Sequence, residues 1–465
     1  MKKCFAIVLV FSIMLHCMIL PAMSVEPESD QSVIMGSNTI DSQLPVLGSE
    51  QLVINARSVL LYETQTDTLM YAWNADERLP PASLAKILTA LIAVEQGDLS
   101  AQVTVRQEVL NTVSKNAVKS DILAGEVLTL EDLLHCMMVD SGNDAAAVIA
   151  DHIAGNQEAF VQQMNEYAHS LGCTNTNFTN AHGIHEENQY STARDLGRIL
   201  AAAVQNESFC DIFGAVYYSV PATNLSEDRH LVSENYLING DIVQIYYDGR
   251  VKGSRTGVTE DKNRCIASVA ESNGLQVVSI ILGSASVYEE GGVKVRSFGG
   301  YTETSDLLDL AFDGYQPCQL IYNGQIMKQE IVENGDCYVS LGTAAAAATV
   351  LPGGVSVDDL DVQYEHASQP LRAPIKRGDL LSCVKFTYGG KCVAQLDLYA
   401  MNSVKSVSNT INTEDNEDTG ASGSQIALMI LIVILAAIII VFFAPRIYRL
   451  LKSKKKNKQR RRRSR

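Results

Sequence analysis

The sequence predicts an α+β fold in which helices pack against one antiparallel sheet. Two short strand-like runs, at 56–63 and 68–73, flank the turn QTDT and predict a β-hairpin. Strand character returns only at 264–270 and 275–283, after a long helical stretch. Because strands stand at both ends of this region and helices fill the middle, the pattern favours an antiparallel sheet with helices packed on it.

Helical periodicity fills the region between these strands. In LPPASLAKILTALIAVEQG, apolar residues recur at the spacing of a helix, and Gly97 is expected to end it. Thr192 and Asp195 have the spacing of a capping box at the start of another helix. Further helices are predicted at about 130–139, 143–154, 157–171, 192–204 and 302–312, the last of which closes the domain.

The residue pattern changes from helical to strand-like after residue 315. Short alternating runs such as CYVSLG and LLSCVKFTY lie between glycine-rich turns and predict a small all-β domain. The polar, acidic segment that follows is typical of a flexible stalk. The predicted order is a signal peptide at 1–24, a linker at 25–50, the α+β domain at 51–315, the all-β domain at 316–405, the stalk at 406–424, a transmembrane helix at 425–444 and a basic cytoplasmic tail at 445–465.

Both ends of the chain have the composition of targeting segments. The start has two lysines, an apolar run and small residues near Ser24, which is typical of a secretory signal peptide; an uncleaved anchor is the alternative. Residues 425–444 carry no charge and match a bilayer core of about 30 Å. The tail after them has 12 basic residues and no acidic one, which the positive-inside rule places in the cytoplasm. These patterns predict a single-pass cell-membrane protein with residues from about 25 to 424 outside the cell and the C-terminus in the cytoplasm.

Charge excludes one class of partner. The formal net charge is −16, but the two ends contribute 14 basic residues and no acidic ones. The remaining part therefore has 23 basic against 53 acidic residues, a formal charge of −30. A body this acidic is not expected to bind nucleic acid, and the basic tail is better explained by the membrane segment before it.

Eight cysteines remain beyond the signal peptide, and none forms a C-x-x-C pair, so no zinc site is predicted. Export permits disulfides. Cys383 with Cys392 and Cys318 with Cys337 are possible pairs, and free thiols are equally compatible with the sequence.

The stretch PASLAKILTA places a hydroxyl and an amine in the first turn of a helix. Ser83 and Lys86 are three residues apart and so share one helix face. A serine attacks only when a base takes its proton, and a lysine desolvated by apolar neighbours can have a pKa low enough to be that base. The same spacing recurs at Ser382 and in the basic tail, and an N-cap serine beside a solvated lysine is the ordinary alternative.

A second motif, VDSGNDAAAVIADHIAG, places Ser141 and Asn143 before an alanine-rich helix. The hydroxyl could pass a proton, and the amide could hold both Lys86 and a substrate carbonyl. Helix capping is the alternative explanation. A further Ser-x-Asn at Ser233 illustrates how common this pattern is.

A third motif, VKGSRTGVT, leads into a strand. Arg255 beside Thr256 would suit a carboxylate, because a fixed cation next to a hydroxyl can grip both oxygens. Gly257 would let a substrate backbone approach closely. A hairpin turn with an exposed arginine is the alternative.

In this order, the three motifs resemble those of the low-molecular-mass penicillin-binding proteins, specifically the serine-type D-alanyl-D-alanine carboxypeptidases. The resemblance covers about residues 50–405 and includes PASLAKILTAL, DSGNDAA, NFTNAHGIHEENQYSTARDLGRI, VKGSRTGVT and VVSIILG. LRAPIKRGDLL is similar to the C-terminal β domain of that family. The resemblance implies a β-lactamase/transpeptidase-like fold and no metal or organic cofactor.

The resemblance also implies a role for each motif residue. Ser83 would be the acylated nucleophile, Lys86 its base and Ser141 a proton relay. The backbone N–H groups of Ser83 and Val258 would form the oxyanion hole. The implied substrate-binding residues are Asn143, Arg255, Thr256, Gly257, Val258 and Thr259.

Arg255 departs from the family pattern, which has lysine there. Arginine keeps the charge but differs in bulk and geometry. If the charge is what matters, activity survives; if the lysine must approach the second serine closely, the enzyme is slow or inactive. Lys252 lies out of register, and Gln189 replaces a frequent histidine, which is a minor change. His182 and His185 are interpreted as loop residues.

The sequence therefore predicts an exported, membrane-tethered carboxypeptidase that removes the terminal D-alanine of peptidoglycan stem peptides through an acyl-enzyme on Ser83. β-Lactams would acylate the same serine. One alternative is a weakened or non-catalytic penicillin- or peptidoglycan-binding protein, because of Arg255. A β-lactamase is the other, although the second domain and the anchor argue against it.

Overall fold

The computed structural model describes residues 52–288, 295–366 and 370–407. The predicted signal peptide, linker, transmembrane helix and basic tail lie outside these ranges, as does the predicted stalk from residue 408 on. Within them, no helix has both the length and the apolar character needed to cross a bilayer.

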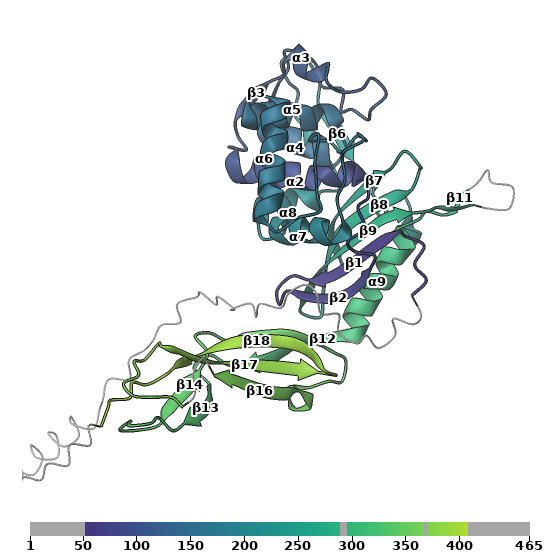
Figure 1. The fold of residues 1–465 in the computed structure, drawn as a ribbon. Coiled ribbons are helices and arrows are strands. Elements are labelled where there is room, and N and C mark those ends of the chain that lie inside the picture. The colour runs from purple at the N-terminus through teal and green to yellow at the C-terminus, as the bar shows by residue number, and fades with distance from the viewer. Residues whose placement is uncertain (1–51, 289–294, 367–369, 408–465) are drawn as a thin grey trace, which may run out of the picture. The chain divides into compact units, whose positions relative to one another are not determined.

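A five-stranded antiparallel sheet forms the centre of the first domain, in the order β2-β1-β9-β8-β7 (Figure 1). The predicted hairpin and late strands are confirmed, because β1 pairs with both β2 and β9. The sheet thus joins the first strand of the domain to its last ones. The strands are β1 (Ser58–Glu63), β2 (Thr68–Trp73), β7 (Val251–Val258), β8 (Arg264–Ser272) and β9 (Leu275–Ser284).

Helices cover both faces of this sheet, which is why its inner strands are apolar on both sides. Leu60 belongs to the core cluster beneath the helical layer, whereas its neighbours Val59 and Leu61 belong to the cluster beneath α9. This alternation follows from the two-residue period of a strand. The longer helices are α4 (Leu130–Met138), α5 (Asn143–Ala154), α6 (Gln157–Ser170), α7 (Ala193–Ala203), α8 (Glu207–Phe213) and α9 (Tyr301–Gly314).

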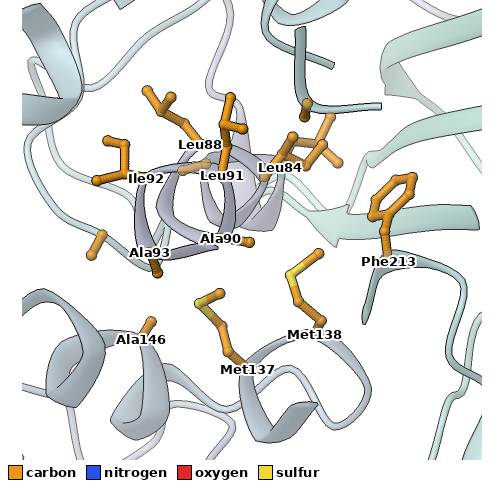
Figure 2. Packing of buried hydrophobic residues seen from close by; sticks show 14 of the residues in the cluster. Leu84, Leu88, Ala90, Leu91, Ile92, Ala93, Met137, Met138, Ala146 and Phe213 are labelled. Carbon is orange, nitrogen blue, oxygen red and sulfur yellow. The ribbon is translucent and has the colours of Figure 1, made fainter. Parts of the chain in front are cut away.

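Helix α2 (Ala85–Gln96) lies inside the helical layer and follows a single 3-10 turn, η2 (Ala82–Leu84). Its residues 85–93 are all buried, and Figure 2 shows Met137, Met138 and Ala146 packed on one side of it. A helix that is apolar all round is buried all round. The Lys86 amine, in the first turn of α2, is therefore removed from water.

The remaining elements of the first domain are short, and periodicity over so few residues gives no clear signal. These short elements are β3 (Gln102–Thr104), α3 (Gln107–Leu110), β4 (Val127–Thr129), β5 (Tyr217–Val220), β6 (Arg229–Val232), η3 (Gln244–Tyr246), β10 (Val287–Tyr288) and β11 (Val295–Ser297).

Thr192 caps α7 as predicted, since its hydroxyl accepts from the Asp195 N–H. The Asp195 carboxylate does not complete a capping box, because it accepts from Asn175 and Thr176 instead.

The second domain is all-β, as the alternating runs predict. One sheet has the order β13-β14-β18-β17-β16, and β12 pairs separately with β15. Its elements are β12 (Tyr315–Ile321), β13 (Ile326–Glu330), β14 (Val339–Gly342), β15 (Ala347–Pro352), η4 (Val357–Asp359), β16 (Asp361–His366), β17 (Leu380–Tyr388) and β18 (Lys391–Ala400).

The possible disulfides are not formed, and the free-thiol alternative holds for all eight described cysteines. Cys383 on β17 lies opposite Asp397, and Cys392 on β18 lies opposite Thr387. The two thiols therefore occupy different positions along the ladder, although they are close in sequence.

Candidate active site

A cleft of about 660 Å³ opens beside the 3-10 turn that carries Ser83. The three motifs meet there: the start of α2, the turn before α5 and the end of strand β7. Lys86 lies beneath Ser83 and is fully buried. The predicted residues that line the cleft are Ser83, Ser141, Asn143, Arg255, Thr256, Gly257, Val258 and Thr259.

The Lys86 amine has three oxygen neighbours. Its Nζ lies 3.4 Å from the Ser83 hydroxyl and donates to Asn143 Oδ1 and to the His182 carbonyl oxygen, both at 2.7 Å. Burial lowers the pKa of Lys86 well below its ordinary value, and the positive charge of Arg255 lowers it further. The arrangement therefore places an amine with a suppressed proton affinity beside a serine hydroxyl.

Arg255 points into the site rather than out of a hairpin turn. Its Nη1 donates to the Met138 carbonyl oxygen at 2.8 Å, and its Nη2 donates to the Ser141 hydroxyl. The side chain is 5% exposed, and burial lowers its pKa to about 10. The arginine thus keeps its charge at neutral pH and contacts the second serine directly.

Two residues of the site have a backbone that L-amino acids rarely adopt. Ala82 has φ 49° and Ser141 has φ 63°, both in the left-handed region. Ala82 immediately precedes Ser83, and Ser141 immediately precedes the glycine that caps α5. Such strain of about 1–3 kcal/mol persists only where surrounding contacts enforce it, and it is concentrated at functional sites.

Two glycines let other segments approach the turn that carries Ser83. A Cβ atom on Gly257 would lie 2.7 Å from the Ser83 nitrogen. A Cβ atom on Gly183, which has φ +83°, would lie 1.9 Å from the Ala82 carbonyl oxygen. Neither position accepts a side chain without moving the turn that carries Ser83.

We expect Gly183→Ala to destabilise the protein by roughly 2–4 kcal/mol, since both the left-handed φ and the backbone overlap must be relieved. Gly172 is the matched control, because its φ is +78° and nothing lies within 4 Å of its Cβ position. Gly172→Ala should cost only the φ penalty, about 1–2 kcal/mol. Denaturant unfolding measures both, and equal losses would contradict a close-approach role for Gly183.

The start of α5 is held by a buried acid that sequence reasoning missed. Asp144 accepts from the backbone N–H groups of Ser120 and Ile122, and Asn143 Nδ2 donates to the Val118 carbonyl oxygen at 2.9 Å. These bonds fasten the 118–122 segment to the helix. They also orient Asn143 so that its Oδ1 faces Lys86.

The end of β7 presents Thr256 to the cleft. The Thr256 side chain is hydrogen-bonded to the phenol of Tyr301, which is 1% exposed. Thr259 is held within the following turn instead, because its hydroxyl and its N–H both donate to the Asn263 carbonyl oxygen. Thr256 is therefore better placed than Thr259 to meet a ligand.

The family model for D-alanyl-D-alanine carboxypeptidases matches residues 46–286, more than half of the chain. The chain belongs to this family. The model of the penicillin-binding protein 5 C-terminal domain matches residues 315–406. The first domain and the all-β domain are thus matched separately and in the same order as the sequence resemblance implies.

Curated relatives have the same family name. The chain is 27% identical over 361 residues to D-alanyl-D-alanine carboxypeptidase DacF of Bacillus subtilis, covering 77% of this chain and 88% of DacF. It is 28% identical over 365 residues to DacA of Haemophilus influenzae, covering 76% and 86%. Among solved structures, penicillin-binding protein 5 from Haemophilus influenzae aligns with a TM-score of 0.63 and 27% identity, covering 76% of this chain and 98% of that one.

Lys252 and Gln189, which were compared above with the family pattern, have clear positions. Lys252 is exposed on β7 and does not line the cleft. Gln189 is buried and accepts from the Thr179 and Asn180 N–H groups while donating to the Ile184 carbonyl oxygen at 2.8 Å, which ties the 179–189 loop together. This supports treating its replacement of histidine as minor.

The two loop histidines differ. His182 contributes its carbonyl oxygen to Lys86, and burial lowers the pKa of its imidazole to about 3. His185 lines the cleft and lies 3.7 Å from Glu260. Within the described part of the chain, no three His, Cys, Asp or Glu side chains are grouped so as to hold a metal ion.

Sequence reasoning missed several residues of the cleft. Ser233 and Asn235, cited above as a chance Ser-x-Asn, line it, as do Arg264 and Tyr301. Only Ser233 and Asn235 had a motif that could have flagged them. Arg264 reaches the cleft through the pairing of β8 with β7, and Tyr301 reaches it from the start of helix α9, and neither position carries a motif.

Proposed function

We propose that this protein is a serine-type DD-carboxypeptidase that removes the terminal D-alanine of peptidoglycan stem peptides through an acyl-enzyme on Ser83. The observation that carries the proposal is the fully buried Lys86 amine, 3.4 Å from the Ser83 hydroxyl. Family membership supports the substrate class. The polar cleft above Ser83 supports an extended peptide as the ligand.

In acylation, neutral Lys86 takes the Ser83 proton as Oγ attacks the carbonyl of the penultimate D-alanine. The backbone N–H groups of Ser83 and Val258 donate to the oxygen that becomes negative. Collapse of the tetrahedral intermediate breaks the peptide bond, and Ser141 passes the proton taken by Lys86 to the departing D-alanine nitrogen, which leaves Lys86 neutral again. Water then attacks the Ser83 ester, which releases the shortened peptide and returns the proton to the serine.

Arg255 fits this scheme as a fixed charge. It contacts Ser141 and lowers the pKa of Lys86, so the charge acts where the proton moves. Both functions need a positive charge in this position, and arginine supplies it. This favours an active enzyme over a decayed site.

The pH dependence of acylation tests the role of Arg255. Because its positive charge lowers the pKa of Lys86, Arg255→Met should raise that pKa, and the acidic limb of kcat/KM should move to higher pH. Arg255→Lys keeps the charge and should leave the limb closer to that of the unaltered enzyme. Asp144 raises the pKa of Lys86, so Asp144→Asn should shift the limb to lower pH. An acidic limb at the same pH in Arg255→Met, Asp144→Asn and the unaltered enzyme would contradict control by Lys86.

The decisive experiment incubates the purified protein with a pentapeptide ending in D-Ala-D-Ala and, separately, with benzylpenicillin. We expect release of D-alanine and a covalent penicillin adduct on the peptide that contains Ser83. An adduct without D-alanine release would favour the penicillin-binding alternative. Rapid turnover of benzylpenicillin, with no accumulated adduct, would favour a β-lactamase.

We also propose that residues 425–444 anchor the protein in the cell membrane with its domains outside. The uncharged length and the basic residues after it support this topology. Cell fractionation of the full chain and of a chain ending at Ser424 tests it. Equal release of the two from membranes would count against the anchor.

A further inference from the structure

Among the described residues, the guanidinium groups of Arg255 and Arg264 line the cleft, and their protein partners differ. Arg255 donates to the Met138 carbonyl oxygen and to the Ser141 hydroxyl. Arg264, the first residue of β8, also lines the cleft. No carboxylate of the described ranges forms an ion pair with it. A cation at a cleft wall without an acidic partner is a candidate for binding an anionic group of the ligand.

Aromatic rings hold the Arg264 side chain in place. Its guanidinium carbon lies 5.0 Å from the ring centre of Tyr301 and 5.5 Å from that of Phe298. Its Nη1 donates to the Tyr301 hydroxyl at 3.4 Å, and its Nε is buried without a hydrogen-bond partner. A guanidinium stacked in this way loses little freedom when it binds a carboxylate.

Tyr301 joins Arg264 to the strand that presents the third motif. The Tyr301 phenol bonds both to Arg264 and to the Thr256 side chain. Arg264 also pairs in register with Val258, two residues beyond Thr256 on β7. The guanidinium and the Thr256 hydroxyl therefore lie on neighbouring strands at the same edge of the cleft.

We propose that Arg264, together with Thr256, binds the α-carboxylate of the C-terminal residue of the substrate. The proposal rests on the function proposed above, because it names how that substrate is held. It also gives the two arginines different roles: Arg255 acts on Ser141 and Lys86, where the proton moves, and Arg264 binds the carboxylate. The competing explanation is that Arg264 only packs against its aromatic neighbours.

The test compares a peptide ending in D-Ala-D-Ala with the same peptide as its C-terminal amide. Binding is measured by calorimetry on the full chain carrying Ser83→Ala, so no turnover interferes. Arg264→Gln should weaken binding of the acid by about 10- to 100-fold, because a charge-assisted hydrogen bond is lost. Binding of the amide should change less than about 3-fold, since the amide carries no charge for Arg264 to meet.

Lys262→Gln is the matched control, because Lys262 is an exposed cation on the adjoining turn that does not line the cleft. It removes the same charge and should leave both affinities unchanged. Arg264→Lys should fall between the unaltered protein and Arg264→Gln, because the charge remains without the paired donors.

Equal losses for acid and amide, or no loss for either, would overturn the assignment, as would failure of both peptides to bind. The outcome is separable from that of the proposed function. If the unaltered enzyme releases D-alanine and Arg264→Gln still prefers the acid to the amide, only the carboxylate site is wrong. If acid binding depends on Arg264 but no D-alanine is released, only the proposed carboxypeptidase activity is wrong.

Discussion

Replacing Ser83 with alanine is expected to lower D-alanine release by at least about 10⁴-fold and to remove the benzylpenicillin adduct. The alanine variant lacks the only atom that the mechanism uses to form the acyl-enzyme, and removal of a nucleophile costs on the order of 10⁴- to 10⁶-fold in serine peptidases. Peptide binding should survive, because the cleft walls are unchanged. Initial-rate assays and intact-mass spectrometry measure the two effects.

The chain supplies its own control for this experiment. Ser382 and Lys385 repeat the Ser-x-x-Lys spacing on β17 of the all-β domain, where the Ser382 hydroxyl donates to the Glu365 carbonyl oxygen. Ser382→Ala should leave D-alanine release and the penicillin adduct unchanged. Residual adduct on Ser83→Ala, or its loss on Ser382→Ala, would mean that the nucleophile has been assigned wrongly.

Replacing Lys86 with methionine is expected to slow acylation by roughly 10³- to 10⁴-fold, because the base that takes the Ser83 proton is lost. Methionine has a similar length and no charge, so the buried position should accept it. The loss should appear in the rate of penicillin acylation measured by stopped flow, and it should be accompanied by loss of the acidic limb that Lys86 governs.

Stability separates this effect from general damage. Lys86→Met removes a buried polar group but leaves Asn143 Oδ1 and the His182 carbonyl oxygen without this donor, so it should lower the free energy of unfolding by no more than about 1–3 kcal/mol and leave the protein folded. Lys385→Met in the second domain is the matched control and should not change acylation. Acylation within 10-fold of the unaltered rate in Lys86→Met would rule out the amine as the base.

Much of the fold was predictable because its elements are long and periodic. The hairpin around QTDT, the helix of Lys86 and the strand 275–283 each repeat a local pattern over six or more residues. Short elements such as β5 and β6 were not predicted, because four residues do not establish a period. Their pairing places Ser233 and Asn235 at the cleft.

The sequence by itself determined which chemical groups the site contains, since Ser83 and Lys86 share one turn of a buried helix and Ser141 and Arg255 stand in motifs of fixed order. Only the tertiary structure decided how they meet. The Lys86 amine bonds to Asn143 and His182, which lie 57 and 96 positions further along the chain, and Arg255 bonds to Ser141, 114 positions before it. Local patterns report backbone periodicity and burial. The direction of Arg255, the carbonyl oxygen of His182 and the stacking of Arg264 on Tyr301 depend on packing between segments that have no sequence relation to each other.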